Sequence, residues 1–200
     1  GKWYPGSLFR TISAQRTRWT TPALAAAARR VVALVAGACA SVAGVGAAPS
    51  AENGAGTDAS AAASLALESK RTTVRKLACD ARVPPDFVLA VLDKESGFDN
   101  AMRGSMGEIG ASQILPSTAL ALGFDVRRLR AEFAYNVQAG ISILQNLLST
   151  TRGDQRKALR HYRAGPMWFR LPPRAQRHVR AYVSSVVEIM KTRYAGVSCP

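Results

Sequence analysis

The sequence predicts a mainly α-helical domain that carries one small loop or β-hairpin insert. Apolar residues recur every three or four positions along residues 131–148, which is the spacing of one face of a helix. Residues 97–110 contain four glycines, and this density favours a loop or a short hairpin over a helix. Several helices around one such insert indicate a mainly α architecture with at most a tiny sheet.

The remaining helices are marked by proline, glycine and apolar spacing. A helix over residues 68–82 is ended by Pro84 and Pro85. A second helix over residues 85–96 has proline in its first turn and ends at Gly97. Further helices are expected at residues 116–122, 154–162 and 174–194.

Composition delimits the folded part of the chain. The chain has 200 residues, of which 48% are hydrophobic and 20% charged, and this is typical of one globular domain. Before about residue 65 the sequence is dominated by Ala, Gly, Ser and Thr, so few side chains there can build a core. We therefore expect a flexible linker over residues 49–67 and the folded domain over residues 68–200.

Residues 1–48 are typical of an N-terminal leader that contains a secretory signal peptide. An uncharged run rich in Ala and Gly over residues 31–48 follows Arg29 and Arg30 and ends in small residues. A retained transmembrane anchor is the alternative, but such a helix needs about 20 strongly apolar residues. We expect export, with the periplasm or cell envelope as the final location.

Removal of the leader would leave two cysteines, Cys79 and Cys199. In an oxidising compartment these two residues can form a disulfide, and two unpaired thiols are the alternative. The two distant cysteines and the isolated His161 and His178 form no ligand cluster, so neither a metal nor a cofactor is expected.

The chain is strongly basic, with a formal charge of +14, and it stays basic without the six cationic residues of the leader. Few acids fall between residues 127 and 193, and this balance suits attraction to a polyanion. No nucleic-acid recognition motif accompanies the charge, so nucleic acid is not an expected partner. The carboxylate-bearing cell wall and anionic lipid surfaces fit an exported protein, and a solvated face without a specific partner is the alternative.

Glu95 is the candidate catalytic residue. Val88, Val91 and Leu92 precede it at helical spacing, so Glu95 continues their apolar stripe toward the core. Partial burial and the negative end of the helix dipole both raise the pKa of a carboxyl there. An acid that is protonated near neutral pH is what cleavage of a glycosidic bond requires, and a solvated glutamate at a helix end is the alternative.

Glu95 also begins a longer pattern. Its parts are Glu95-Ser96-Gly97-Phe98, Gly110-Ala111-Ser112-Gln113-Ile114-Leu115-Pro116-Ser117-Thr118-Ala119, Asn136-Val137, Tyr162-Arg163-Ala164-Gly165-Pro166 and Tyr182-Val183. In order and spacing, about residues 70–194 resemble the catalytic domain of the soluble lytic transglycosylases, which are related to goose-type lysozymes. The resemblance implies a lysozyme-like α+β fold. The small single domain resembles the specialised members of the family that open gaps in the cell wall for a secretion or conjugation machine.

The resemblance implies that Glu95 is the single catalytic acid/base. Gln113 and Tyr162 would contact the glycan, and Ser96 would support the turn that carries Glu95. The implied reaction cleaves the MurNAc-GlcNAc β-1,4 bond of peptidoglycan strands and leaves 1,6-anhydro-MurNAc ends, and the expected state is a monomer. The sequence departs from the family at Ala111-Ser112, where the family has Leu-Met, at Arg163, where it has Asn, and at His178-Val179, where it has Glu-Thr.

Glu108 leaves a second reaction open. As a second carboxylate it could activate water in an inverting muramidase, if the carboxyl groups were about 6.5–9.5 Å apart. Alternatively, Glu108 accepts hydrogen bonds from amides of the glycine-rich loop. A third hypothesis is a wall-docking factor for a secretion or conjugation complex with weak or absent cleavage. Trp168 and Phe169 either stack on sugar rings or anchor a loop, and Tyr182 is expected to be a packing residue.

Overall fold

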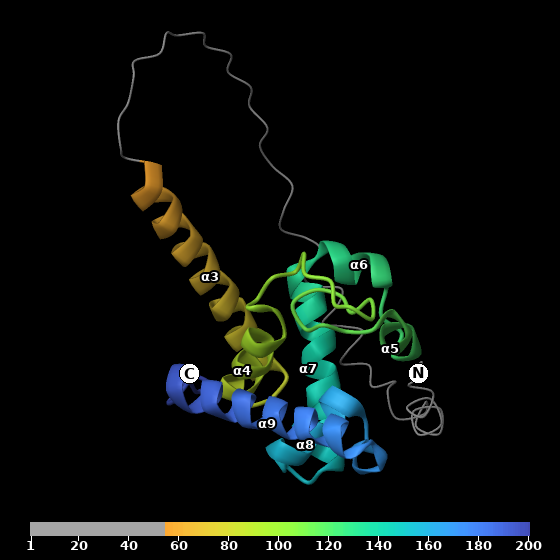
Figure 1. Ribbon diagram of the computed structural model, residues 1–200. Coiled ribbons are helices and arrows are strands. Elements are labelled where there is room, and N and C mark those ends of the chain that lie inside the picture. The colour runs from red at the N-terminus through yellow and green to blue at the C-terminus, as the bar shows by residue number, and fades with distance from the viewer. Residues whose placement is uncertain (1–54) are drawn as a thin grey trace, which may run out of the picture. The chain divides into compact units, whose positions relative to one another are not determined.

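The computed structural model describes residues 55–200, which fold into helices with a long loop between the second and third of them (Figure 1). The elements are α3 (Ala55–Asp80), α4 (Pro85–Ser96), α5 (Pro116–Ala121), α6 (Val126–Ala131), α7 (Phe133–Thr150), α8 (Gln155–Ala164), the 3-10 helix η2 (Trp168–Arg170) and α9 (Pro173–Arg193). The prediction of a mainly α-helical domain is confirmed. The leader and signal peptide predicted for residues 1–48 lie outside the described residues.

The first helix begins earlier than the sequence predicts. Residues 49–67 are expected to be a flexible linker, but α3 begins at Ala55 and includes residues 55–67. Alanine is the strongest helix former, and five of residues 59–66 are alanine, so this segment can be helical without tertiary support. Side chains 59–66 are exposed, and Leu67 is the first described side chain of α3 that packs against the main core.

α9 connects the helical elements that form the main core. It packs against both α4 and α8, and α8 packs against α7 (Figure 1). The buried cluster between these helices includes the largest buried side chains of α4 and residues from α3, α7, α8 and α9 (Val74, Phe87, Leu92, Val137, Leu159, Val183). The C-terminal turn of α4 therefore ends against α9.

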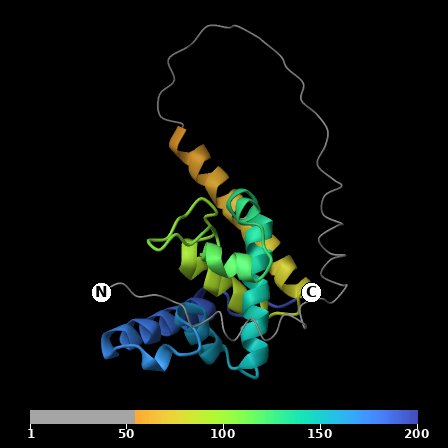
Figure 2. The ribbon, with the colours of Figure 1, turned by 90° about the vertical axis from the view of Figure 1, so that its right-hand side faces the viewer.

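A second, smaller core lies beneath the loop between α4 and α5. It contains Ile109 and Ile114 from the loop, Ala119 from α5, Leu129 from α6 and Ala139 from α7. Isolated antiparallel bridges join Arg103 to Ile109 and Ile109 to Ile114, so the predicted hairpin insert is present in minimal form. The loop, yellow-green in Figure 2, is thus a packed element rather than a free connection.

The two ends of the described core are tied together. A disulfide joins Cys79 to Cys199, with the Cα atoms 5.6 Å apart, which is the pairing that the sequence suggested. The guanidinium of Arg75 donates to the carbonyl of Ser198 at 2.9 Å. These contacts attach the segment after α9 to the end of α3.

Candidate active site

Glu95 lies in the last turn of α4, one residue before the helix ends. Val88, Val91 and Leu92 are fully buried, so the stripe predicted from their spacing does face the core, and Glu95 lies half-buried at its edge. Burial is the largest influence on Glu95 and raises its pKa above the ordinary glutamate value. A carboxyl that retains its proton toward neutral pH can act as a general acid.

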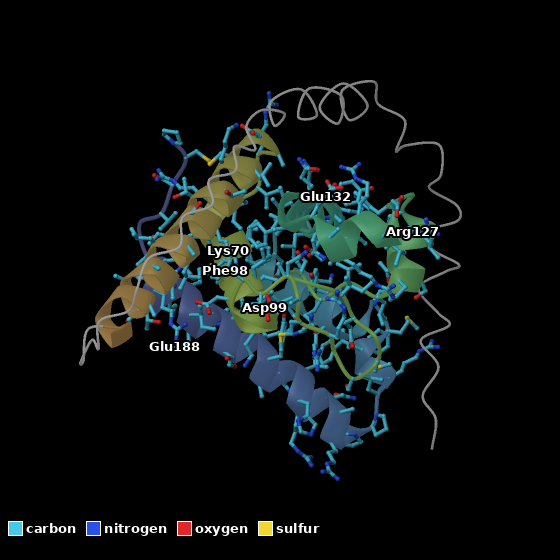
Figure 3. All side chains as sticks on the ribbon, turned by 90° about the horizontal axis from the view of Figure 1, so that it is seen from above. Lys70, Phe98, Asp99, Arg127, Glu132 and Glu188 are labelled. Atoms are coloured by element: carbon cyan, nitrogen blue, oxygen red, sulfur yellow. A yellow bond between two sulfur atoms is a disulfide. The ribbon has the colours of Figure 1, made fainter. Side chains whose placement is uncertain are left out.

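The chain turns sharply directly after Glu95. Gly97 ends α4 in the left-handed conformation, with a φ of 61°, and its N–H donates to the carbonyl of Asp93. Phe98 is also left-handed, with a φ of 67°, and its ring is buried. Figure 3 shows Phe98 and Asp99 at this turn, where the Asp99 carboxylate accepts the N–H of Ala101 at 2.7 Å. The buried ring and the turn together hold the end of α4 in place.

Tyr182 is hydrogen-bonded to the candidate acid. Its hydroxyl donates to Oε1 of Glu95 at 2.6 Å, from the middle of α9, and its ring is buried. The expectation that Tyr182 only packs is therefore incomplete. This bond stabilises the carboxylate and lowers the pKa of Glu95, in opposition to burial. The occurrence of Tyr182-Val183 in the family pattern was the available clue to this role.

Tyr162 approaches the same carboxyl from α8. Its hydroxyl donates to the backbone carbonyl of Ser112 at 2.6 Å, which fixes the ring against the loop. Burial and the negative charge of Glu95 raise the pKa of Tyr162 well above 10. Burial likewise raises the pKa of Tyr182 well above 10. Both phenols therefore remain protonated hydrogen-bond donors beside Glu95 over the whole neutral range.

Arg163 adds a positive charge to the site. Its guanidinium lies 5.6 Å from the centre of the Tyr182 ring, and its charge lowers the pKa of Glu95. The family pattern has an asparagine at this position, so this departure supplies a cation next to the acid.

Ser96 and Ser112 form hydrogen bonds between the loop and the surrounding helices. The Ser96 hydroxyl donates to the carbonyl of Ala111 at 2.8 Å, which agrees with a supporting role and places this side chain on the backbone. The N–H of Ser112 donates to Oδ1 of Asn136 at 2.8 Å. Since Tyr162 donates to the carbonyl of Ser112, this loop residue couples α7 to α8.

Asn136 of α7 is completely buried and holds the loop through hydrogen bonds. In addition to receiving the N–H of Ser112, its amide donates to the carbonyls of Ile109 at 3.0 Å and Leu129 at 3.2 Å. Gly110, with a φ of 70°, lies so close that a Cβ there would overlap the Asn136 amide. Asn136 therefore determines how the loop is seated, a role that the sequence pattern alone did not reveal.

Gln113 is the expected glycan ligand of the loop. In the structure, its side-chain amide forms a hydrogen bond with the backbone of the loop. Nε2 donates to the carbonyl of Gly110 at 2.9 Å, while the residue itself is left-handed, with a φ of 46°. Its Oε1 and a carboxylate oxygen of Glu108 both face Gly104, where any Cβ would collide with them. The two polar side chains therefore converge at the absent side chain of Gly104.

Glu108 takes the role of loop acceptor. Its Oε2 accepts the N–H of Met106 at 2.9 Å. Its negative charge also raises the pKa of Glu95, so the two carboxylates interact electrostatically. In the described part of the chain, no group of three or more His, Cys, Asp or Glu side chains could hold a metal ion. The ionisable groups that act on Glu95 include the Tyr182 phenol, the Arg163 guanidinium and the Glu108 carboxylate.

The transglycosylase SLT domain matches this chain over residues 72–180, which is more than half of its length. The chain belongs to this family. A similar solved structure is that of an inactive glutamate-to-glutamine mutant of lytic transglycosylase Slt from Pseudomonas aeruginosa, with a TM-score of 0.50 and 18% identity. The similarity covers 64% of this chain and 25% of that one, so the chain spans a quarter of the length of Slt. At this identity the likeness shows a shared fold.

Two departures from the SLT pattern are explained by the geometry of this SLT domain. Ser112, at the position of a methionine in the family, lies against Gly140 of α7, where a Cβ would overlap the Ser112 hydroxyl. That hydroxyl donates to the carbonyl of Asn136 at 3.3 Å. At the other departure, Arg163 lies over Tyr182. The Ser112 side chain thus fixes the loop to α7, whereas the charge of Arg163 acts on Glu95.

Proposed function

We propose that this protein is a peptidoglycan lytic transglycosylase that cleaves the MurNAc-GlcNAc β-1,4 bond and leaves 1,6-anhydro-MurNAc ends. The observation that carries the proposal is the half-buried Glu95, whose pKa is raised by burial and whose Oε1 accepts the Tyr182 hydroxyl. Membership of the SLT domain family supports the choice of bond.

One carboxyl can perform the whole reaction. Protonated Glu95 donates to the bridging oxygen, the bond from MurNAc C1 to that oxygen breaks, and the GlcNAc side leaves with the proton. The Glu95 carboxylate then removes the proton of the MurNAc C6 hydroxyl, whose oxygen closes on C1 to form the anhydro ring. Glu95 regains its proton and no water is consumed. Because Oε1 is occupied by Tyr182, Oε2 is the oxygen available for both transfers.

The intermediate sugar cation needs stabilisation between the two steps. In the single-acid reaction the N-acetyl group of the substrate supplies it, which is the substrate-assisted exception to the usual pair of carboxylates. The Tyr162 hydroxyl donates its proton to the Ser112 carbonyl and keeps an oxygen lone pair near Glu95, and this lone pair can accept the N–H of that acetamido group. The hydrogen bond from Met106 to Glu108 supports a loop role for the second carboxylate rather than activation of water.

Glu95→Gln is the decisive variant. The amide retains the shape of the side chain and can still accept from Tyr182, but it cannot transfer the proton. We expect turnover to fall by about 10²- to 10⁴-fold or more with an unchanged circular dichroism spectrum. Glu188→Gln, which changes an exposed glutamate of α9, is the matched control and should retain full activity. Retained turnover in Glu95→Gln would refute the assignment.

Mass spectrometry of digested peptidoglycan separates the three hypotheses. Anhydro ends from the wild type support the transglycosylase, and Glu108→Gln should then change the rate only modestly. Reducing ends, together with loss of about 10²- to 10⁴-fold in Glu108→Gln, would establish a muramidase in which Glu108 activates water. Absence of products from the wild type would favour a wall-docking factor.

We also propose that the protein acts in the periplasm or cell envelope, in the service of a secretion or conjugation complex. The predicted signal peptide and the disulfide between Cys79 and Cys199 support an oxidising compartment. Cell fractionation followed by alkylation of free thiols tests the location. The expected result is an alkylation-resistant protein in the periplasmic or envelope fraction, and a thiol-reactive cytoplasmic protein would contradict it.

A further inference from the structure

Positive charge is concentrated in one stretch of the sequence. Residues 155–187 contain eight Lys and Arg residues and no acid, whereas residues 61–154 contain eleven cationic and ten acidic residues. The eight cations are distributed over α8, η2 and the first half of α9 (Arg156, Lys157, Arg160, Arg163, Arg170, Arg174, Arg177, Arg180). More than half of the formal charge of +14 therefore belongs to 33 residues.

Trp168 joins the two helices that carry these cations. The Arg160 guanidinium of α8 lies 5.1 Å from the centre of the Trp168 ring, and that of Arg180 from α9 lies 6.0 Å from it. Arg160 of α8 and Arg180 of α9 therefore meet at Trp168, and we call the cation-rich surface of residues 155–180 around this point the cationic face. Arg163, over Tyr182, carries this face to the edge of the active site.

An aromatic side chain projects from the middle of the cationic face. Phe169 is 55% exposed, and the Arg170 guanidinium lies 6.0 Å from the centre of its ring. The backbone around it is fixed, because the amide of Gln176 donates to the carbonyls of Phe169 at 2.8 Å and Leu171 at 2.9 Å. The backbone that carries the exposed ring is therefore held in place by hydrogen bonds.

We propose that the cationic face binds the surface of an anionic lipid bilayer, with Phe169 inserted at the level of the headgroups. An aromatic residue surrounded by Lys and Arg is the composition of segments that lie in a membrane interface. Each cation near an anionic surface strengthens binding about fivefold, so the face gains from many weak contacts. No helix in the described part of the chain is long and apolar enough to cross a membrane.

A glycan strand fits this face less well than a lipid surface does. Sugar hydroxyls need polar partners of both kinds beside the aromatic ring, and residues 155–187 contribute no carboxylate. The Gln176 amide, which contacts the backbone of Phe169, already donates to two backbone carbonyls. Diffuse positive charge with an exposed ring matches the phosphates and acyl boundary of a bilayer.

Sedimentation of the full chain with vesicles tests the proposal. The wild type should bind vesicles that contain phosphatidylglycerol and should bind pure phosphatidylcholine vesicles at least tenfold more weakly. Arg174→Gln combined with Arg177→Gln should lower binding on the order of tenfold. The matched control combines Arg127→Gln with Arg130→Gln on α6, where Arg127 is labelled in Figure 3, and should bind as the wild type does.

Phe169→Ala tests the inserted ring and should weaken vesicle binding severalfold. Its control is Leu65→Ala, which removes an even more exposed apolar side chain from α3. Equal loss in the charge variants of α6 and α9 would overturn the proposal, because binding would then depend only on net charge. Binding to isolated cell-wall sacculi that is lost in Phe169→Ala, without binding to vesicles, would assign the face to the wall instead.

Tryptophan fluorescence locates the contact independently of the first sixty residues. The chain has three tryptophans, so Trp3→Phe combined with Trp19→Phe leaves Trp168 as the only emitter. Vesicles with brominated phosphatidylglycerol should quench this emission, and unbrominated vesicles should not. Vesicle binding without quenching would place the contact elsewhere and would refute the proposed face.

Discussion

The pKa of Glu95 is set by its burial and by residues of two other helices. Burial raises its pKa, while the Tyr182 hydrogen bond and the charge of Arg163 lower it, and burial is the largest influence. The proposed reaction places two demands on this pKa, since Glu95 has to be protonated to cleave the bond and ionised to accept the C6 proton. Its neighbours can be altered one at a time, and each gives a separate prediction.

Tyr182→Phe removes the hydroxyl and keeps the buried ring. We expect turnover to fall by about 10- to 100-fold, because a hydrogen bond to a charged group is lost at the step where Glu95 is a carboxylate. KM should change little. The measurement is steady-state cleavage of soluble glycan strands. Tyr135→Phe is the control, since that hydroxyl bonds to the N–H of Asp125, and equal losses in both variants would point to a stability effect.

Arg163→Asn restores the residue of the family pattern and should shift the pH profile. The positive charge of Arg163 stabilises the Glu95 carboxylate, so its removal raises the pKa of Glu95. Cleavage needs the protonated acid, and the rate therefore falls as the pH rises through that pKa. The alkaline limb of the profile should move to higher pH in Arg163→Asn. Arg156→Asn, which changes an exposed arginine about two turns away along the same helix, should leave it in place.

The sequence is sufficient to locate Glu95 and insufficient to identify the side chains that contact it, for a physical reason. Helical periodicity decides which face of α4 is buried, so the location of Glu95 follows from its neighbours in sequence. The Tyr182 contact crosses 87 positions of sequence and depends on how α4 and α9 pack. Periodicity shows that Tyr182 faces inward and does not show what its hydroxyl meets.

At the scale of elements, the loop after α4 depends on α7. Asn136 is buried and bonds to three backbone groups, one on Ser112, one on Ile109 and one on Leu129. The same loop contributes the acceptor for Tyr162 and the side chains of Glu108 and Gln113. The position of the loop is therefore part of the catalytic geometry.

Asn136→Ala should destabilise the domain by about 2–4 kcal/mol, because it leaves several buried backbone groups without partners. The free energy of unfolding, from urea denaturation followed by circular dichroism, measures this. Asn146→Ala, on the same helix but away from the loop contacts, should cost less than about 1 kcal/mol. Similar values for the two variants would show that the loop does not depend on the Asn136 amide.

Local signals predicted some elements and missed others. The helix over residues 85–96 was predicted with its observed bounds, because proline and glycine mark both ends. The short helix α6 was missed, although its Asp125 cap accepts the N–H groups of Arg127 and Arg128 and is a readable start signal. The alanine-rich sequence before residue 68 predicts a linker, whereas residues 55–67 belong to α3. Composition alone does not separate a solvated helix from a coil.

At the scale of the whole molecule, the segment after α9 is fastened at several points. Asp93 of α4 pairs with Arg193 at 3.0 Å and accepts the Tyr194 hydroxyl at 2.8 Å. Burial, and then this bond to Asp93, raise the pKa of Tyr194 to about 12. The disulfide between Cys79 and Cys199 adds a covalent tie across 120 positions of sequence.

Reduction of the disulfide should lower the free energy of unfolding by about 2–5 kcal/mol, because the unfolded chain regains the freedom of a long loop. Guanidinium denaturation with and without reductant measures the difference. The variant with Cys79→Ser and Cys199→Ser should match the reduced wild type and should not respond to reductant. A midpoint of the wild type that is insensitive to reductant would show that the noncovalent contacts suffice.

The position of Tyr182 has a practical consequence for anyone who trims this protein. The match to the SLT domain ends at residue 180, two positions before the tyrosine that donates to Glu95. A fragment cut at that boundary would contain the acid, Gln113 and Tyr162, yet it would lack the hydroxyl on Oε1 and the second half of α9. Such a fragment would keep the family signature without the Tyr182 hydrogen bond to Glu95, so we expect it to be less active than a chain that extends through α9.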